Sequence, residues 1–288
     1  MSVTAVGPAL DLDGPLPVAR KHSLLETRWT DPDGEMGGVL KAEAGDRWLN
    51  GVNVYGYPDG VPRLWEPCSA GTFRPKEEGD EVPGARFDAF VAYFPLSCSR
   101  LGMGDFEDWY DRARKAINAT QSHAMEAMLA NGVIGSTNPF LGDTNLTALS
   151  GGVVSPAAGL AYLENAIGRV TGRMGMIHAT PAVVSRWGEG HGLANDSPLG
   201  LFTTGGTPVV SGSGYIDSDP VSQPGGGTTI DWVYATGPVE VRILEGTNTS
   251  EEESLDRADN SVVVRAERFS LVEWDTALQV GIRIDWAA

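Results

Sequence analysis

The clearest pattern of apolar positions lies between residues 105 and 132 and predicts one long helix. Asp105 is a suitable N-cap, and Asn131-Gly132 is a suitable stop because glycine readily adopts a left-handed conformation. A helix from Asp105 to Asn131 would be about 40 Å long at ~1.5 Å per residue, so it must run along a large body. Apolar side chains recur at steps of three and four residues, at Phe106, Trp109, Tyr110, Ala113, Ala116, Ile117, Ala124 and Met128.

Two shorter helices are predicted where a proline follows a hydroxyl residue that can cap a helix. Ser155-Pro156 and Thr180-Pro181 each match the rule that proline is favoured at the first helical position. Between them, the apolar run from Met174 to His178 predicts a short buried strand. The apolar faces that follow the two starts consist of Leu160, Leu163, Ile167 and Val170, and of Val183, Val184 and Trp187.

The last third of the chain changes to the alternation typical of strands. Strands are predicted over 207–211, 230–235 and 239–244, and Thr236-Gly-Pro238 between the last two predicts a hairpin. Two final strands are predicted over 261–272 and 277–286. Their expected inward residues are Val262, Val264, Ala266, Phe269, Leu278, Val280, Ile282, Ile284 and Trp286.

The first hundred residues contain little that predicts an independent core. Residues 1–46 carry several prolines and no sustained period, which is typical of an arm. Residues 47–97 alternate short apolar stretches with turns and include the charged stretch 76–83, a pattern that predicts an extended hairpin. Such a hairpin buries itself poorly, so its aromatic side chains are candidate inter-subunit contacts: Trp48, Tyr55, Tyr57, Trp65 and Phe73.

Composition and charge narrow the class of protein. Of the 288 residues, 41% are hydrophobic and 20% are charged, which excludes a disordered chain. The net charge of −17 disfavours non-specific binding to nucleic acid. Neither a membrane span nor a signal peptide is indicated, so we expect a protein made in a cytoplasm, with Cys68 and Cys98 as reduced thiols.

Residues that could carry chemistry are few, and the sequence predicts no catalytic residue, cofactor or metal site. The four histidines lie at no recognised metal-binding spacing. His178, at the end of an apolar run, is interpreted as a structural histidine, with an enzyme centred on His178 and Glu189 or His191 as a less favoured alternative. Gly212-Ser-Gly214 does not complete a nucleophile elbow and is interpreted as a turn.

The order of these elements resembles a major capsid protein of the Hong Kong 97 type, as found in tailed bacteriophages of actinobacteria. The resemblance covers residues 20 to the end and rests on the long helix, on the segment 175–184 and on the segment 260–277. It implies an α+β capsid fold in which the long helix, over 105–131, is the spine. It also implies these regions: an N-terminal arm (1–46), an extended loop (47–97), a peripheral domain (98–150 and 255–288) and an axial domain (151–254).

The resemblance also implies a function. The chain would be a structural subunit, not an enzyme, that self-assembles through hexamers and pentamers into an icosahedral shell around double-stranded DNA. Implied partners are a separate scaffolding protein, a portal and a minor capsid or decoration protein, with no sequence-specific DNA contact and no membrane. Assembly would occur in the host bacterial cytoplasm. Two alternatives stay open at this point: an encapsulin-like nanocompartment shell and a phage tail or baseplate protein.

Overall fold

The computed structural model describes most of the chain after residue 17. The described residues are 18–30, 36–41, 46–55, 84–98, 106–132, 137–170, 172, 174–188, 193–197, 200–216, 229–244, 254–256 and 261–288. They contain the helices α1 (Phe106–Asn131), α2 (Pro156–Val170) and α3 (Pro181–Gly188), and the short 3-10 turns η1 (Leu24–Glu26), η2 (Arg47–Asn50) and η3 (Ser213–Tyr215). None of the helices within these ranges is long and apolar enough to cross a membrane.

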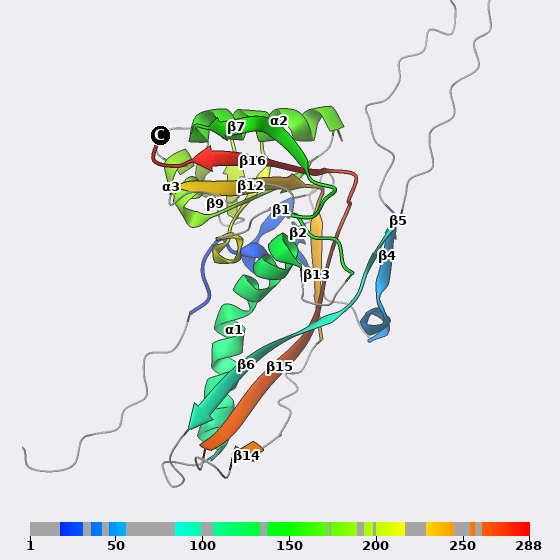
Figure 1. Cartoon of the computed structure of the whole chain (residues 1–288), viewed down its shortest axis with the longest axis vertical. Helices are drawn as coiled ribbons and strands as arrows, with labels where there is room; N and C mark the ends of the chain where they lie inside the picture. Colours follow the sequence, from blue (N-terminus) through cyan, green and yellow to red (C-terminus); the bar gives the residue numbers. More distant parts are fainter. Residues whose placement is uncertain are drawn as a thin grey trace, which may run out of the picture.

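Helix α1 confirms the long helix predicted from the apolar period. It ends as predicted, because Gly132 has a φ of 76° and its amide donates to the Met128 carbonyl over 2.7 Å. The predicted N-cap, Asp105, lies outside the described residues. Figure 1 shows α1 extending from the main body alongside β6 and β15. Ala113 and Ile117 of α1 are buried in a cluster with Val264 and Ala266 of β15.

A seven-stranded mixed sheet forms the larger unit. Its strands, in spatial order, are β7 (Thr147–Val154), β16 (Gln279–Asp285), β12 (Ile230–Thr236), β8 (Met176–Ala179), β11 (Pro208–Ser211), β10 (Gly200–Thr203) and β9 (Leu193–Ser197). Helices α2 and α3 begin at the predicted prolines and bury Leu163 and Trp187 against this sheet. Trp187 also donates from Nε1 to the Pro156 carbonyl over 2.8 Å, which joins the C-terminal end of α3 to the start of α2.

A second, five-stranded sheet lies beside α1. It contains β14 (Ser254–Asp256), β15 (Ser261–Trp274), β13 (Val239–Ile243) and β3 (Leu40–Lys41), and β6 (Phe90–Cys98) pairs with β15. Two small antiparallel ribbons complete the described strands: β1 (Arg28–Thr30) with β2 (Met36–Gly38), and β4 (Val52–Tyr55) with β5 (Gly84–Phe87). Val264 and Ala266 on β15 face inward, as predicted, and they pack against α1.

The predicted hairpin at Thr236-Gly-Pro238 is wrong. Strand β12 pairs with β16 in the larger sheet, whereas β13 pairs with β15 in the smaller one. Thr236 lies opposite Gln279, and Val239 lies opposite Trp274. The segment β12–β13 and the segment β15–β16 are therefore paired on both sides of a corner, and together they pass from one sheet to the other. A Cβ on Gly237 would lie 3.0 Å from the Cβ of Asp275, so the chains approach closely at this corner. The sequence marks a turn, but the long partner strands decide that it is a corner.

The sheets also divide the chain differently from the predicted domain ranges. Strand β16 lies in the range 255–288, assigned to the peripheral domain, but it belongs to the seven-stranded sheet. Strand β13 lies in the range 151–254, assigned to the axial domain, but it belongs to the five-stranded sheet. This arrangement follows from the corner, because β12–β13 and β15–β16 each contribute one strand to the seven-stranded sheet and one to the five-stranded sheet.

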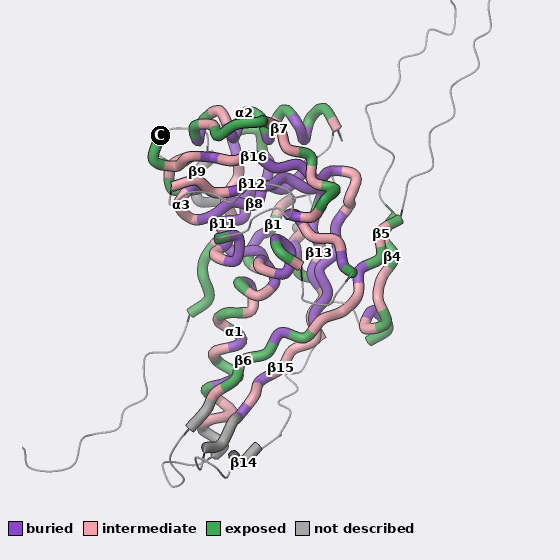
Figure 2. Tube along the Cα trace, viewed as in Figure 1, coloured by how far each residue is buried: buried purple, intermediate pink, exposed green. Residues whose placement is uncertain are grey.

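A shared hydrophobic core joins the two sheets at the C-terminal half of α1. Met125 and Leu129 of α1 belong to the same buried cluster as Trp232 of β12 and Trp274 of β15. In Figure 2 the buried residues concentrate in the seven-stranded sheet and at this junction, whereas buried, intermediate and exposed residues mix along the coloured part of β6 and β15. The junction of the two sheets is therefore buried, whereas β6 and β15 are partly exposed where they extend away from it.

Candidate assembly surface

The outward side of β6 is an apolar surface without a covering element among the described residues. Side chains alternate along a strand, so one set faces α1 and the other faces away. The inward set is Ala92, Phe94 and Leu96. The outward set is Val91, Tyr93 and Pro95, all exposed, with Tyr93 63% exposed. Large exposed apolar surfaces on a folded chain mark interaction sites.

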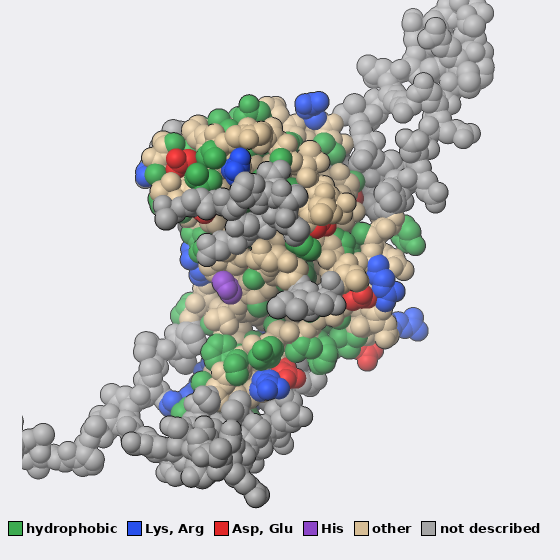
Figure 3. All heavy atoms as spheres, viewed as in Figure 1, with side chains coloured by type: hydrophobic (Ala, Val, Ile, Leu, Met, Phe, Trp, Pro, Cys, Tyr) green, Lys and Arg blue, Asp and Glu red, His purple; other side chains and the backbone are tan. Residues whose placement is uncertain are grey.

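Charged side chains of β15 border this surface. The strand register places Arg265 opposite Pro95 and Glu267 opposite Tyr93. The guanidinium carbon of Arg265 lies 5.6 Å from the centre of the Tyr93 ring, and its Nη1 lies 3.6 Å from Glu267 Oε1. In Figure 3 hydrophobic side chains form a band over β6 and β15 with acidic and basic side chains beside it. We call Val91, Tyr93, Pro95, Arg265 and Glu267 the outer β6 face.

The β4–β5 ribbon provides a second projecting surface. Figure 1 shows it standing to one side of the body, next to the end of β6. Its base is anchored because Phe87 is fully buried and its ring centre lies 4.8 Å from that of Trp274. Tyr55, near the other end, is 72% exposed. The ribbon is thus fixed at one end and presents an aromatic side chain at the other.

The five predicted contact residues differ in whether they are exposed, buried or outside the described residues. Tyr55 is exposed on β4, as a contact residue must be in a free subunit. The prediction that Trp48 is a contact residue is wrong. Trp48 lies in η2, is only 6% exposed and belongs to the shared core, so it is not available to another subunit. Tyr57, Trp65 and Phe73 lie outside the described residues. Tyr93 was not among the predicted contact residues, because β6 is apolar almost throughout and its sequence does not mark one face as exposed.

Comparison with known proteins gives structural matches only. No protein-family model matches the chain, and no curated protein matches its sequence. A chain from the capsid of a native GTA particle is similar in structure, with a TM-score of 0.51 and 13% identity, over 99% of this chain and 96% of that one. A chain from Microbacterium phage Oxtober96 matches with a TM-score of 0.50 and 12% identity, over 98% and 96%. This chain has a capsid-protein fold. The predicted α+β fold of the Hong Kong 97 type is confirmed.

A third solved structure is also similar over part of its length. The SrpI encapsulin of Synechococcus elongatus is similar with a TM-score of 0.42 and 12% identity, over 72% of this chain and 76% of that one.

His178 is a structural residue, as predicted. It is completely buried in β8, with Nδ1 2.9 Å from Tyr215 Oη and Nε2 2.9 Å from Thr236 Oγ1. The Thr236 hydroxyl donates to the Gly237 carbonyl over 2.7 Å, so it accepts from Nε2–H, and Nδ1 accepts from Tyr215. Burial lowers the pKa of His178 to about 3, so the ring is neutral at physiological pH. Glu189 and His191 lie outside the described residues.

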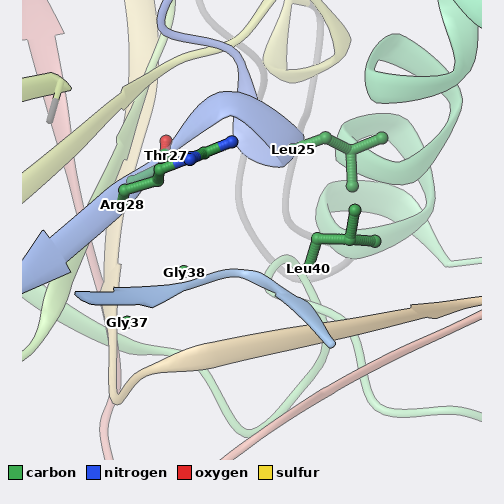
Figure 4. A pocket seen from close by; sticks show the side chains of 6 residues that line it. All are labelled: Leu25, Thr27, Arg28, Gly37, Gly38 and Leu40. Atoms are coloured by element: carbon green, nitrogen blue, oxygen red, sulfur yellow. The ribbon is translucent and has the colours of Figure 1, made fainter. Parts of the chain in front are cut away.

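One small pocket lies at the N-terminal segment, between η1–β1 and β2–β3. It has a volume of about 210 Å³, and its lining residues are Leu25, Thr27, Arg28, Gly37, Gly38 and Leu40. Figure 4 shows the side chains of Leu25 and Leu40 pointing toward each other across it. These residues include one cation and no carboxylate, thiol or imidazole, so they offer no acid–base pair for catalysis. Within the described ranges, no group of three or more His, Cys, Asp or Glu side chains could hold a metal ion.

Proposed function

We propose that the chain is a major capsid protein, a structural subunit that self-assembles into an icosahedral shell around double-stranded phage DNA. The observation that carries the proposal is the capsid-protein fold, matched over 99% of the chain. The outer β6 face supports it, because an exposed apolar surface on a single subunit is what a closed symmetric assembly covers. The proposed role is structural, without catalysis.

The two sheets take different places in the proposed shell. The seven-stranded sheet with α2 and α3 would form the axial domain at the centre of each hexamer or pentamer. Helix α1 and the five-stranded sheet would form the peripheral domain, with α1 as its spine. The segment between β4 and β5 would be the extended loop that reaches a neighbouring subunit, and residues 1–46 would include the arm. Strands β13 and β16 are assigned here by their sheets and not by their position in the sequence.

The proposed partners follow from the role in a virion. A separate scaffolding protein, a portal and a minor capsid or decoration protein would join the shell, which would assemble in the host bacterial cytoplasm. The packaged DNA would be held without sequence-specific contacts. The net charge of −17 supports this view, because strong attraction to phosphate requires an excess of Lys and Arg.

Negative-stain microscopy of the chain, expressed alone and together with its neighbouring scaffold gene, tests the proposal. We expect capsomers or closed shells. A chain that stays monomeric under every condition contradicts the proposal. An adjacent gene for a peroxidase or ferritin-like cargo would indicate the encapsulin alternative, and tubes or baseplate-like rings would indicate a tail protein. Terminase, portal and protease genes upstream would support the capsid assignment.

Replacing Tyr93 by aspartate tests the outer β6 face directly. The new carboxylate would have to be desolvated at a subunit contact, so we expect capsomers and shells to be lost, while the circular dichroism spectrum and Tm of the free subunit stay unchanged. Tyr162 on α2 is a matched control, because it is 48% exposed but lies in the other unit. Y162D assembles normally on this view; equal assembly of Y93D and the parent chain, judged by size-exclusion chromatography, would contradict the role of this face.

A further inference from the structure

Residues 18–27, here called the N-terminal strap, lie across the C-terminal half of α1 and belong to neither large sheet. At least four hydrogen bonds attach the strap to other parts of the chain, and one of them runs from the Val39 amide to the Thr27 carbonyl over 3.2 Å. The Ser211 amide donates to the His22 carbonyl over 2.8 Å, Ser23 Oγ donates to Ser122 Oγ over 3.1 Å, and the Leu24 amide donates to Glu126 Oε1 over 3.0 Å. Leu24 is fully buried and is the main apolar contact of the strap.

Glu126 is the group on which this arrangement converges. The residue is 1% exposed, and its carboxylate accepts two backbone amides, Leu24 on Oε1 and Gly214 of η3 on Oε2, the second over 3.0 Å. One side chain of α1 therefore holds both the strap and η3. Gly212-Ser-Gly214, interpreted from the sequence as a turn, allows this approach, since a Cβ on Gly214 would lie 2.5 Å from the backbone nitrogen of Ala127.

The electrostatic balance at Glu126 depends on these two amides. Burial raises the pKa of the Glu126 carboxyl, whereas the bonds from Gly214 and Leu24 lower it, as do the nearby His123 and Arg20. Tyr215, also buried here, has its own pKa raised, first by burial and then by the charge of Glu126. A buried carboxylate is tolerated when such charge-assisted bonds offset its desolvation. The docked strap supplies one of the two bonds.

We propose that Glu126 holds the N-terminal strap reversibly against α1. When its carboxylate cannot accept both amides, residues 18–27 leave α1, while the helices and both large sheets stay folded. Most of what joins the sheets lies outside the strap: the corner at Gly237 and the shared core around Trp232 and Trp274, to which the strap contributes Leu24. Segments held by few bonds open before the core does. Release of the strap's ten residues would add about 30 Å to the reach of the preceding chain, at ~3.3 Å per extended residue.

Hydrogen–deuterium exchange of the E126Q variant tests the proposal and does not require assembly. Glutamine keeps the size of the side chain but has one acceptor oxygen, and its NH2 group would face a backbone N–H donor. We expect exchange in peptides covering 18–27 and 213–215 to become at least about tenfold faster, equivalent to ~1.4 kcal/mol. Exchange in β12 and β16 should not change.

The matched control is E26Q, which alters an exposed carboxylate in η1 of the strap itself and should leave exchange as in the parent chain. A rescue variant combines E126Q with S23C and S122C in a chain carrying C68S and C98S. Oxidation should restore protection of the strap, because the two Oγ atoms lie 3.1 Å apart.

Two outcomes would overturn the proposal: unchanged exchange over 18–27 in E126Q, or an equal rise in β12 and β16, which would make Glu126 a general stabiliser. If E126Q does not fold, S122A gives the same readout by removing the second side-chain bond of the strap. There we expect exchange over 18–27 to rise about threefold. No change in S122A would equally contradict a strap held by these bonds.

Discussion

The free subunit is expected to lose about 2 kcal/mol of unfolding free energy between pH 7 and pH 5 because of His178 alone. The folded pKa is lowered to about 3 by burial, whereas the unfolded ring titrates near its ordinary value of 6.5. Below pH 6.5 the unfolded chain therefore binds a proton that the folded chain does not bind. The stability contributed by the neutral ring is complete above pH 6.5 and is lost as pH falls toward 3, at ~1.4 kcal/mol per pH unit.

Urea unfolding at a series of pH values measures this effect. The H178Q variant should be less stable at pH 7, because it disturbs the bonds to Tyr215 and Thr236, but its stability should change little between pH 7 and pH 5. H123Q is the matched control: His123 is exposed on α1, bonds to Ser213 and should leave the slope in place. A full pH slope in H178Q would show that another group causes it.

Replacing Gly214 by alanine is expected to cost about 3 kcal/mol of stability. The new Cβ would overlap the carbonyl oxygen of His123 and lie 2.5 Å from the nitrogen of Ala127, and both are backbone atoms of α1 that cannot turn away. Turn η3 would be pushed from the helix, and the bond from the Gly214 amide to Glu126 would lengthen. Thermal unfolding of G214A should show a Tm lower than that of the parent chain by about 5 °C for a chain of this size.

Gly168 provides a control position at which the same substitution is expected to increase stability. It is exposed in α2 and a Cβ there would meet nothing within 4 Å. G168A should therefore stabilise the chain by about 0.5–1 kcal/mol, because alanine loses less backbone freedom than glycine on forming a helix. If G214A were as harmless as G168A, the close contact between η3 and α1 would not be important for stability.

The helices could be predicted well because their signals are local. The apolar period of α1, the stop at Gly132 and the prolines at the starts of α2 and α3 each act within a few residues. The buried strand β8 was also found from its apolar run, and the strands β15 and β16 from local alternation. The order of these elements was sufficient to suggest the capsid fold, since connectivity is itself a property of the sequence.

The candidate site was predicted less well. Trp48 and Tyr55 are both aromatic residues in the same turn-rich region, but Trp48 is buried in the shared core and Tyr55 is exposed on β4. Local sequence does not distinguish them, because burial depends on what the rest of the chain packs against each side chain. Tyr93 was missed for the same reason: the alternation along β6 gives two faces, and only the position of α1 decides which one is covered.

By itself, the sequence determined the three helices, the strands β8, β11, β12, β13, β15 and β16, and the absence of a recognisable catalytic motif, because these depend on neighbouring residues; it did not predict β7, β9 or β10. Only the tertiary structure decided that Thr236-Gly-Pro238 is a corner between two sheets, that His178 is paired with Tyr215 and Thr236, and that Glu126 joins α1 to Leu24 and Gly214. The physical reason is common to all three. Strand pairing and the satisfaction of buried polar groups depend on partners far away in the chain, whose approach is decided by packing of the whole molecule.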